Sequence, residues 1–270
     1  VPARRRDPEG VDASKHFGDM ILLDHVVIGD DEKHRRCKGN NGERYGLNFM
    51  DNATGMKGFM PVADKSAATA KWAMTQTIGT RPITKVYSDC APELQKLCRE
   101  SGWVHPTSTP HRPQSHGKIE VEGRKTLEGS RANLYQSGFE HIMWPTASGH
   151  HNCAMNVANI DPITKDTAWY RLHGKDFDGI LVPYGARVQY KPKGPHATEA
   201  DSVTFRRKMD PPVVDGAFCG WHIDPGFEWH GDYLVAPLDF FRKDGDTSTV
   251  PIHRVKGLTL LDGDWQFPLK

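Results

Sequence analysis

Three short apolar segments of strand length follow one another near the start of the chain, and they constrain the fold more than any other feature. They cover 18–27, 45–52 and 58–63, and loops rich in Gly, Asn and charged residues separate them. Consecutive strands joined by such loops form an antiparallel meander. Ser66 then has the character of an N-cap for a helix that runs to Ile78. The beginning of the chain therefore predicts a sheet followed by a helix.

The next segments alternate between strand and helix patterns. We expect a strand, a helix, a strand, a long helix and a further helical region at 82–87, 92–99, 103–107, 116–136 and 140–160. Three strands, a helix, a strand and a helix-rich end is the element order of an RNase H-like α/β core. The predicted fold class is α/β, with a mixed five-stranded sheet covered by helices.

The residue pattern of the sequence changes at about position 179. From there, short β-favouring pieces such as I-L-V-P-Y and G-A-F-C-G-W alternate with Gly and Pro turns, which predicts a small C-terminal β-barrel domain. The predicted organisation is a linker, an RNase H-like core, a connector and an all-β domain at 1–16, 17–160, 161–178 and 179–270. The opening V-P-A-R-R-R-D-P-E-G is typical of a linker or of an internal cut from a longer polyprotein.

Composition excludes several classes of protein. Thirty-five basic residues face 34 acidic ones, so any basic surface must be local. No apolar run approaches the length of about 18 residues that a membrane span needs. The five cysteines are scattered and never spaced C-x-x-C, which favours reduced thiols over a disulfide framework or a zinc ribbon. His150, His151 and Cys153 are too tightly spaced for zinc and lack an evident fourth ligand.

Two aspartates interrupt or end apolar strands. Asp24 lies inside I-L-L-D-H-V-V, where an ionised group is unfavourable unless it is paired or binds a cation. Asp89 follows the predicted strand 82–87, and strand ends are where α/β sheets build their sites. The alternative for each aspartate taken singly is a turn-forming or helix-capping residue.

A third carboxylate comes from the long predicted helix. At about 100° per residue, Glu120 lies at the edge of an apolar stripe, and Arg124 and Arg131 lie beside it on an exposed ridge. Glu122 falls on the far side, about 200° from Glu120. This placement favours Glu120 over Glu122 as a site residue. The alternative is an ordinary Glu–Arg pair on a solvated helix face, which contributes only a few tenths of a kcal/mol.

The segment that leads into this helix resembles a known family signature. The run T-P-H-R-P-Q-S-H-G-K-I-E, 109–120, is similar to the loop and helix of retroviral and copia-type retrotransposon integrases, with the family's residues in register at Pro113, Gln114, Gly117 and Glu120. The segments R-Y-G-L-N-F-M-D-N-A-T-G, M-W-P-T-A and D-T-A-W-Y-R-L-H-G-K also resemble the copia pattern. The strands with Asp24 and Asp89 are similar to those that carry the family's first two carboxylates. The resemblance spans about 17–240.

The resemblance implies a polynucleotidyl transferase with an Asp-Asp-Glu triad. Asp24, Asp89 and Glu120 would be the catalytic residues and would bind two Mg²⁺ or Mn²⁺ ions, Asp24 bridging both ions, because clustered carboxylates suit hard cations. The activity would be 3′-end processing and strand transfer of DNA, with water or a DNA 3′-hydroxyl as the nucleophile. Residues around the carboxylate helix would contact DNA: Arg112, Gln114, His116, Lys118, Arg124, Lys125 and Arg131. The alternative for them is a solubilising face.

The family also implies partners and a location. Integrases act as multimers on element ends and target DNA in the nucleus, after release from a cytoplasmic particle or a polyprotein. Two features depart from the pattern: Cys-Ala-Pro-Glu follows Asp89 in place of Asn-Gly-Gly-x-Phe, and the 30 residues between Asp89 and Glu120 are a few short of the usual spacing. Two alternatives therefore stay open, a non-catalytic DNA-binding or multimerisation module derived from an integrase, and an RNase H-like nuclease.

Overall fold

The first sheet of the protein is mixed and carries helices on both faces. The computed structural model describes residues 14–28, 38–106, 117–192, 212–241 and 249–270. The strand order is β3-β2-β1-β4, and the bounds are β1 Ile21–Val27, β2 Tyr45–Asp51, β3 Lys57–Val62 and β4 Val86–Tyr87. The first three strands form an antiparallel meander, and β4 pairs with β1 in parallel. This order gives the RNase H-like core that the sequence predicts.

The predicted fifth strand at 103–107 is much shorter than expected. In the described residues it is one parallel bridge, between Lys85 and Val104. The Val104 N–H donates to Thr84 and its carbonyl accepts from Val86, and no further pair follows. Pro106 has no N–H to continue the ladder, which accounts for the early end of the pairing.

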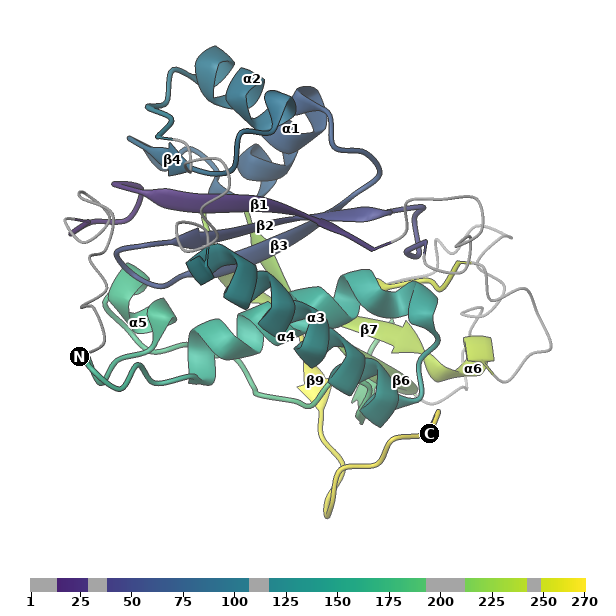
Figure 1. Ribbon diagram of the computed structural model, residues 1–270. Helices are drawn as coiled ribbons and strands as arrows, with labels where there is room; N and C mark the ends of the chain where they lie inside the picture. The colour runs from purple at the N-terminus through teal and green to yellow at the C-terminus, as the bar shows by residue number, and fades with distance from the viewer. Residues whose placement is uncertain (1–13, 29–37, 107–116, 193–211, 242–248) are drawn as a thin grey trace, which may run out of the picture.

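Helices cover both faces of this sheet (Figure 1). On one face lie α1 Ala67–Ile78 and α2 Pro92–Ser101, and on the other lie α3 Gly117–Ser137 and α4 Trp144–Ala158. As predicted, Ser66 caps α1, because its side chain accepts the Thr69 N–H. The alternation along β1 matches the two helical layers: Ile21 and Leu23 belong to the cluster with α1 and α2, whereas Leu22 packs with residues of α3.

A second, antiparallel sheet follows a short helix, α5 Ala168–His173, that lies in the predicted connector. Its strand order is β8-β7-β6-β5-β9, and the bounds are β5 Arg187–Tyr190, β6 Val214–Asp224, β7 Glu228–Pro237, β8 His253–Val255 and β9 Leu258–Thr259. Two register shifts bend β6. Among the described strands β8 and β9 stay unpaired with each other, so the sheet curls without closing into a barrel.

One β-favouring piece of the sequence is not a strand. Residues 180–184 run beside β6 without laddering. Side chains take up their carbonyl groups instead: the Trp221 indole N–H donates to Ile180, and His150 Nε2 lies 3.0 Å from the Val182 oxygen. Because Pro183 lacks an N–H, regular pairing is interrupted at this point.

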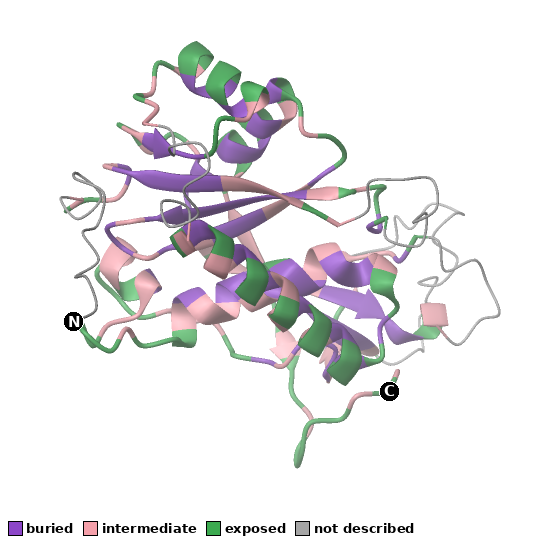
Figure 2. Cartoon of the chain, in the orientation of Figure 1, coloured by how far each residue is buried: buried purple, intermediate pink, exposed green. Residues whose placement is uncertain are grey.

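The two sheets share apolar packing through α4. Phe59 of β3, Trp144 and Ala147 of α4 and Ala217 of β6 belong to one buried cluster. Figure 2 shows α4 mostly buried between the layers, whereas α3 exposes one side. The predicted boundary between core and all-β region stays a prediction, but hydrophobic contacts cross it.

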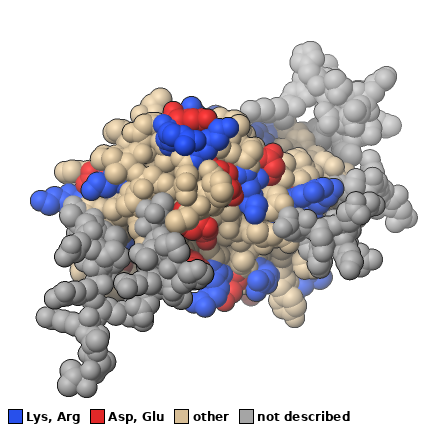
Figure 3. Space-filling view, turned by 45° about the horizontal axis from the view of Figure 1, so that its top comes forward, with Lys and Arg blue, Asp and Glu red and all other residues tan. Residues whose placement is uncertain are grey.

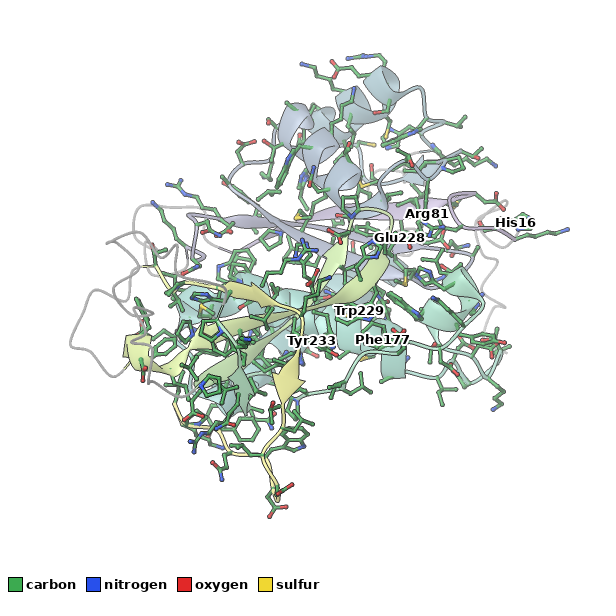
Figure 4. The ribbon with its side chains drawn as sticks, turned by 180° about the vertical axis from the view of Figure 1, so that it is seen from behind. His16, Arg81, Phe177, Glu228, Trp229 and Tyr233 are labelled. Atoms are coloured by element: carbon green, nitrogen blue, oxygen red, sulfur yellow. The ribbon has the colours of Figure 1, made fainter. Side chains whose placement is uncertain are left out.

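The β6–β7 hairpin makes a second connection between the sheets. Phe227 at its tip has φ 61°, is 5% exposed, and packs 6.1 Å from Phe17 and 5.8 Å from Phe49, measured between ring centroids. Beside it, Arg81 after α1 forms an ion pair of 3.1 Å with Glu228 (Figure 4). The tip of the second sheet is therefore inserted into the core of the first.

Candidate active site

The register of the first sheet brings two predicted site residues together. In the parallel pair, Ile21 is opposite Val86 and Leu22 is opposite Tyr87. Continuing this register by two residues places Asp24 beside Asp89, where β4 has just ended. Because side chains alternate along a strand, Asp24 faces the same side as Leu22, which is the α3 side.

The third predicted residue approaches the same face from α3. Glu120 lies in the first turn of this helix and is exposed. Its neighbour Ile119 is buried against the sheet, in a cluster with Leu22 and Tyr87. The Asn48 side-chain amide of β2 donates to the Ile119 carbonyl over 3.4 Å. The packing of Ile119 against the sheet therefore fixes the direction in which the Glu120 side chain projects.

The electrostatics of Asp24 show that Asp89 and Glu120 lie within the range of charge–charge interaction with it. Burial and the negative charges of Asp89 and Glu120 raise the pKa of Asp24 from 3.8 to about 6, against the opposing effect of a hydrogen bond from the His25 backbone. Repulsion from both acids requires both to lie near Asp24. The structure therefore brings together the three residues that the sequence singles out.

The donor set fits a hard divalent cation in type and charge. It offers carboxylate oxygens alone, and a cation would relieve the repulsion that raises the pKa of Asp24. The carboxylates are farther apart than the ligands of a metal centre, because no three Asp, Glu, His or Cys side chains of the described residues are close enough to hold one ion. The pocket is therefore acidic, but its carboxylates are not gathered around one point.

Two histidines adjoin the carboxylates, and the sequence patterns did not identify either. His105 Nε2 lies 2.7 Å from the Ser88 hydroxyl, which donates to the Asp89 carbonyl over 3.0 Å. Burial lowers the pKa of His105, although the charge of Asp89 opposes this. His25 faces the α2 side of β1, with Nδ1 3.9 Å from Glu93 and neither ring nitrogen hydrogen-bonded. Only the strand register reveals these positions, since both residues stand in segments read as apolar strands.

Glu122 lies on the side of α3 away from Glu120, and that side is not solvated. Its side chain is 13% exposed and forms an ion pair with Lys57 at the start of β3. Lys125 Nζ adds a contact of 2.8 Å. Although burial raises the pKa of Glu122, hydrogen bonds from the two lysines lower it overall. A single-helix projection missed this pair because α3 is covered on two sides, by the sheet and by α4.

The predicted DNA-contacting residues divide into two groups. Arg112, Gln114 and His116, together with Pro113 of the signature, lie outside the described residues. Four basic residues are exposed on α3: Lys118, Arg124, Lys125 and Arg131. On the face that Figure 3 shows, the coloured Lys and Arg side chains are interspersed with Asp and Glu. Within these described segments no ion pair joins Glu120 to Arg124.

The remaining predicted absences concern zinc, disulfides and membranes. His150 is buried and stacks on Trp221 at 4.9 Å between ring centroids, so it is part of the core. The cysteines in the described ranges, Cys90, Cys98, Cys153 and Cys219, are free thiols, and Cys37 lies outside those ranges. No described helix combines the length and the apolar character needed to cross a membrane.

Comparison with known proteins gave matches among solved structures alone. No protein-family model matches the chain, and no curated protein sequence matches it. The catalytic core domain of BIV integrase is 18% identical, with a TM-score of 0.40, over 56% of this chain and 91% of that chain. The HTLV-2 integrase catalytic core domain, in complex with magnesium in a trimeric form, is 14% identical, with a TM-score of 0.44, over 58% and 98%.

A longer match covers both sheets. The simian T-cell lymphotropic virus intasome, in complex with the PP2A regulatory subunit B56 gamma, is 14% identical, with a TM-score of 0.49, over 95% of this chain and 84% of that chain. The RNase H-like fold of the present chain follows from the strand order and register of its own first sheet.

Proposed function

We propose that the chain is an integrase-type polynucleotidyl transferase that uses Asp24, Asp89 and Glu120 for metal-dependent DNA 3′-end processing and strand transfer. The observation that carries this proposal is the register of β1 and β4, which places Asp24 beside Asp89 on the face of the sheet that the first turn of α3, with Glu120, covers. Burial and the charges of Asp89 and Glu120 also raise the pKa of Asp24, and a bound divalent cation would offset that repulsion.

Separate groups of residues would bind the metal ions, bind DNA phosphates and position the backbone at Asp89. Asp24 and Asp89 on the sheet and Glu120 on α3 would hold Mg²⁺ or Mn²⁺, which when bound activates an attacking oxygen and stabilises a leaving one. Lys118, Arg124, Lys125 and Arg131 are exposed along α3 and would hold DNA phosphates beside the carboxylates. Ser88 and His105 would keep the backbone at Asp89 in place.

Several narrower features belong to the same proposal. The copia-type sequence pattern supports an origin in the polyprotein of a retrotransposon or of a retrovirus-like element. Integrase function would require a homo-oligomer that holds element ends and target DNA, and it would take place in the nucleus.

A joining assay tests the proposed function. The purified chain is incubated with Mn²⁺, a plasmid target and blunt duplexes with randomised ends, and joined products are sequenced. We expect selected ends to be trimmed and joined, and we expect Asp24→Asn and Glu120→Gln to abolish both steps. Glu128→Gln, which removes another exposed acid of α3, is the matched control and should leave them unchanged. Equal joining by all variants would refute the assigned site.

The non-catalytic alternative is favoured by one observation. The described carboxylates do not form a group that could hold a metal ion as they stand. A DNA-binding module derived from an integrase would bind the duplexes in the same assay without trimming or joining them. Trimming without joining would instead indicate a nuclease.

A further inference from the structure

A cavity lies between the two sheets, away from the carboxylates. Its volume is 380 Å³, which is within the range of small-molecule sites, roughly 300–1,000 Å³. The free edge of β3, one side of α4 and the bulged part of β6 form its walls, and most of the lining is apolar, with Met60, Trp221 and Phe227 among the large side chains. Such walls favour a ligand with a flat, apolar body.

The backbone at the edge of β3 presents one hydrogen-bond donor and one acceptor to this cavity. Asn156 binds both the N–H and the carbonyl of Lys57, over 2.9 and 2.7 Å, so these groups point away from β2. Two residues along the strand, the N–H and carbonyl of Phe59 must point the same way. Phe59 lines the cavity, and in the described residues no partner takes up these two groups.

A second residue of the wall carries an unused donor. Trp169 lines the cavity and is 3% exposed, yet its indole N–H has no hydrogen-bond partner among the described residues. Buried donors are satisfied in nearly all proteins, so a missing partner indicates an acceptor that the described residues do not provide. Several other polar groups of the wall are already engaged, as His150 is with Val182.

We propose that this cavity binds a flat, uncharged heteroaromatic compound that presents one hydrogen-bond donor and at least two acceptors. The donor pairs with the Phe59 carbonyl, one acceptor with the Phe59 N–H and another with the Trp169 indole N–H. A charged ligand is disfavoured, since Asp224 at the wall is already bound by His222 and Arg254, and Lys57 by Glu122.

Titration with phthalazin-1(2H)-one tests the proposal on the full chain. This bicyclic lactam has adjacent N–H and carbonyl groups and a further ring nitrogen. Binding is followed through the indole N–H resonances of the ¹⁵N-labelled protein, with Trp169→Phe used to assign the Trp169 signal. We expect saturable binding that shifts that signal, and about fivefold weaker binding of the N-methylated lactam, which lacks the donor.

Gly149 supplies the matched variants. This residue lines the cavity on α4, and a Cβ at its position meets no atom within 4 Å, so the larger side chain of Gly149→Leu has room at the cavity wall. We expect Gly149→Leu to weaken lactam binding at least tenfold and Gly149→Ala to leave it within twofold. No binding up to the solubility limit, equal binding of the two lactams, or full binding by Gly149→Leu would overturn the proposal. Asp24→Asn should not affect binding, which separates this site from the carboxylates.

Discussion

The side chain of Asn156 forms two hydrogen bonds with the backbone of Lys57, donating to its carbonyl over 2.7 Å and accepting its N–H over 2.9 Å. A residue of α4 thus takes the place of a neighbouring strand at the edge of the first sheet. Asn156→Ala leaves both backbone groups of Lys57 without partners beside a buried helix. We expect the free energy of unfolding to fall by about 1–3 kcal/mol, measured by urea denaturation.

Asn159→Ala is the matched control for this prediction. Asn159 is exposed and follows the last residue of the same helix. Its replacement should change stability by less than about 0.5 kcal/mol. Equal effects of the two substitutions would mean that the bond to the strand edge contributes nothing.

The raised pKa of Asp24 predicts how stability depends on pH. Its pKa is about 6 in the folded protein and 3.8 in the reference state, so protonated Asp24 favours folding, and this contribution is lost as pH rises from about 4 through 6. Asp24→Asn removes the ionisable group. At pH 8 the variant should therefore be more stable than the wild type, by at most about 3 kcal/mol, the equivalent of the shift.

Paired denaturation curves at pH 8 and pH 3.5 measure this difference. The gain from Asp24→Asn should shrink towards zero at the lower pH, where Asp24 is protonated in both states. Glu128→Gln controls for the loss of one negative charge and should show no such change with pH. A gain that is equal at both pH values would contradict the prediction.

The contact of Phe227 with Phe17 and Phe49 predicts that the two sheets unfold together. Phe227→Ala removes a ring buried between them, and we expect a loss of about 3–5 kcal/mol. Arg81→Ala breaks the neighbouring ion pair with Glu228, whose side chains are 30% and 51% exposed, and should reduce stability by less than about 1 kcal/mol. Separate unfolding of the two sheets in the wild type, seen as two calorimetric transitions, would contradict this coupling.

Local sequence signals predicted most of the elements, because those elements depend on local chemistry. The cap at Ser66, the helix start at Pro92 and the apolar strand around Asp24 can all be recognised without tertiary information. The carboxylates could be singled out for the same reason, since an acid within an apolar strand stands out. Their assembly into one site depends on the parallel register of β1 and β4, which the sequence does not encode locally.

The features that the sequence did not predict are those that depend on contacts with another helix or strand. Residues 180–184 have β-favouring composition, yet Trp221 and His150 bind their carbonyls and replace a strand ladder. Phe227 reads as an ordinary hairpin residue, although it fills the core of the other sheet. Trp169 belongs to a family-like segment, and only the fold places it at a cavity.

Glu120 and Glu122 provide the sharpest test of how function and stability are divided along α3. Glu122 is bound by Lys57 and Lys125, and its lowered pKa means that its charge stabilises the fold at neutral pH and that this contribution is lost as pH falls. Glu122→Gln should therefore reduce stability at pH 7 by about 1–3 kcal/mol. Glu120→Gln should change it by less than about 0.5 kcal/mol, because Glu120 is exposed.

The joining assay should show the opposite order for the same two substitutions. Glu120→Gln should abolish Mn²⁺-dependent joining in a protein that is fully folded by circular dichroism. Glu122→Gln should keep joining activity at temperatures well below its own unfolding midpoint, because Lys57 binds the Glu122 carboxylate and Glu122 is not among the charges that act on Asp24. If Glu122→Gln were inactive while folded and Glu120→Gln remained active, the third carboxylate of the site would be Glu122, and the helix would have to present its other side to the substrate.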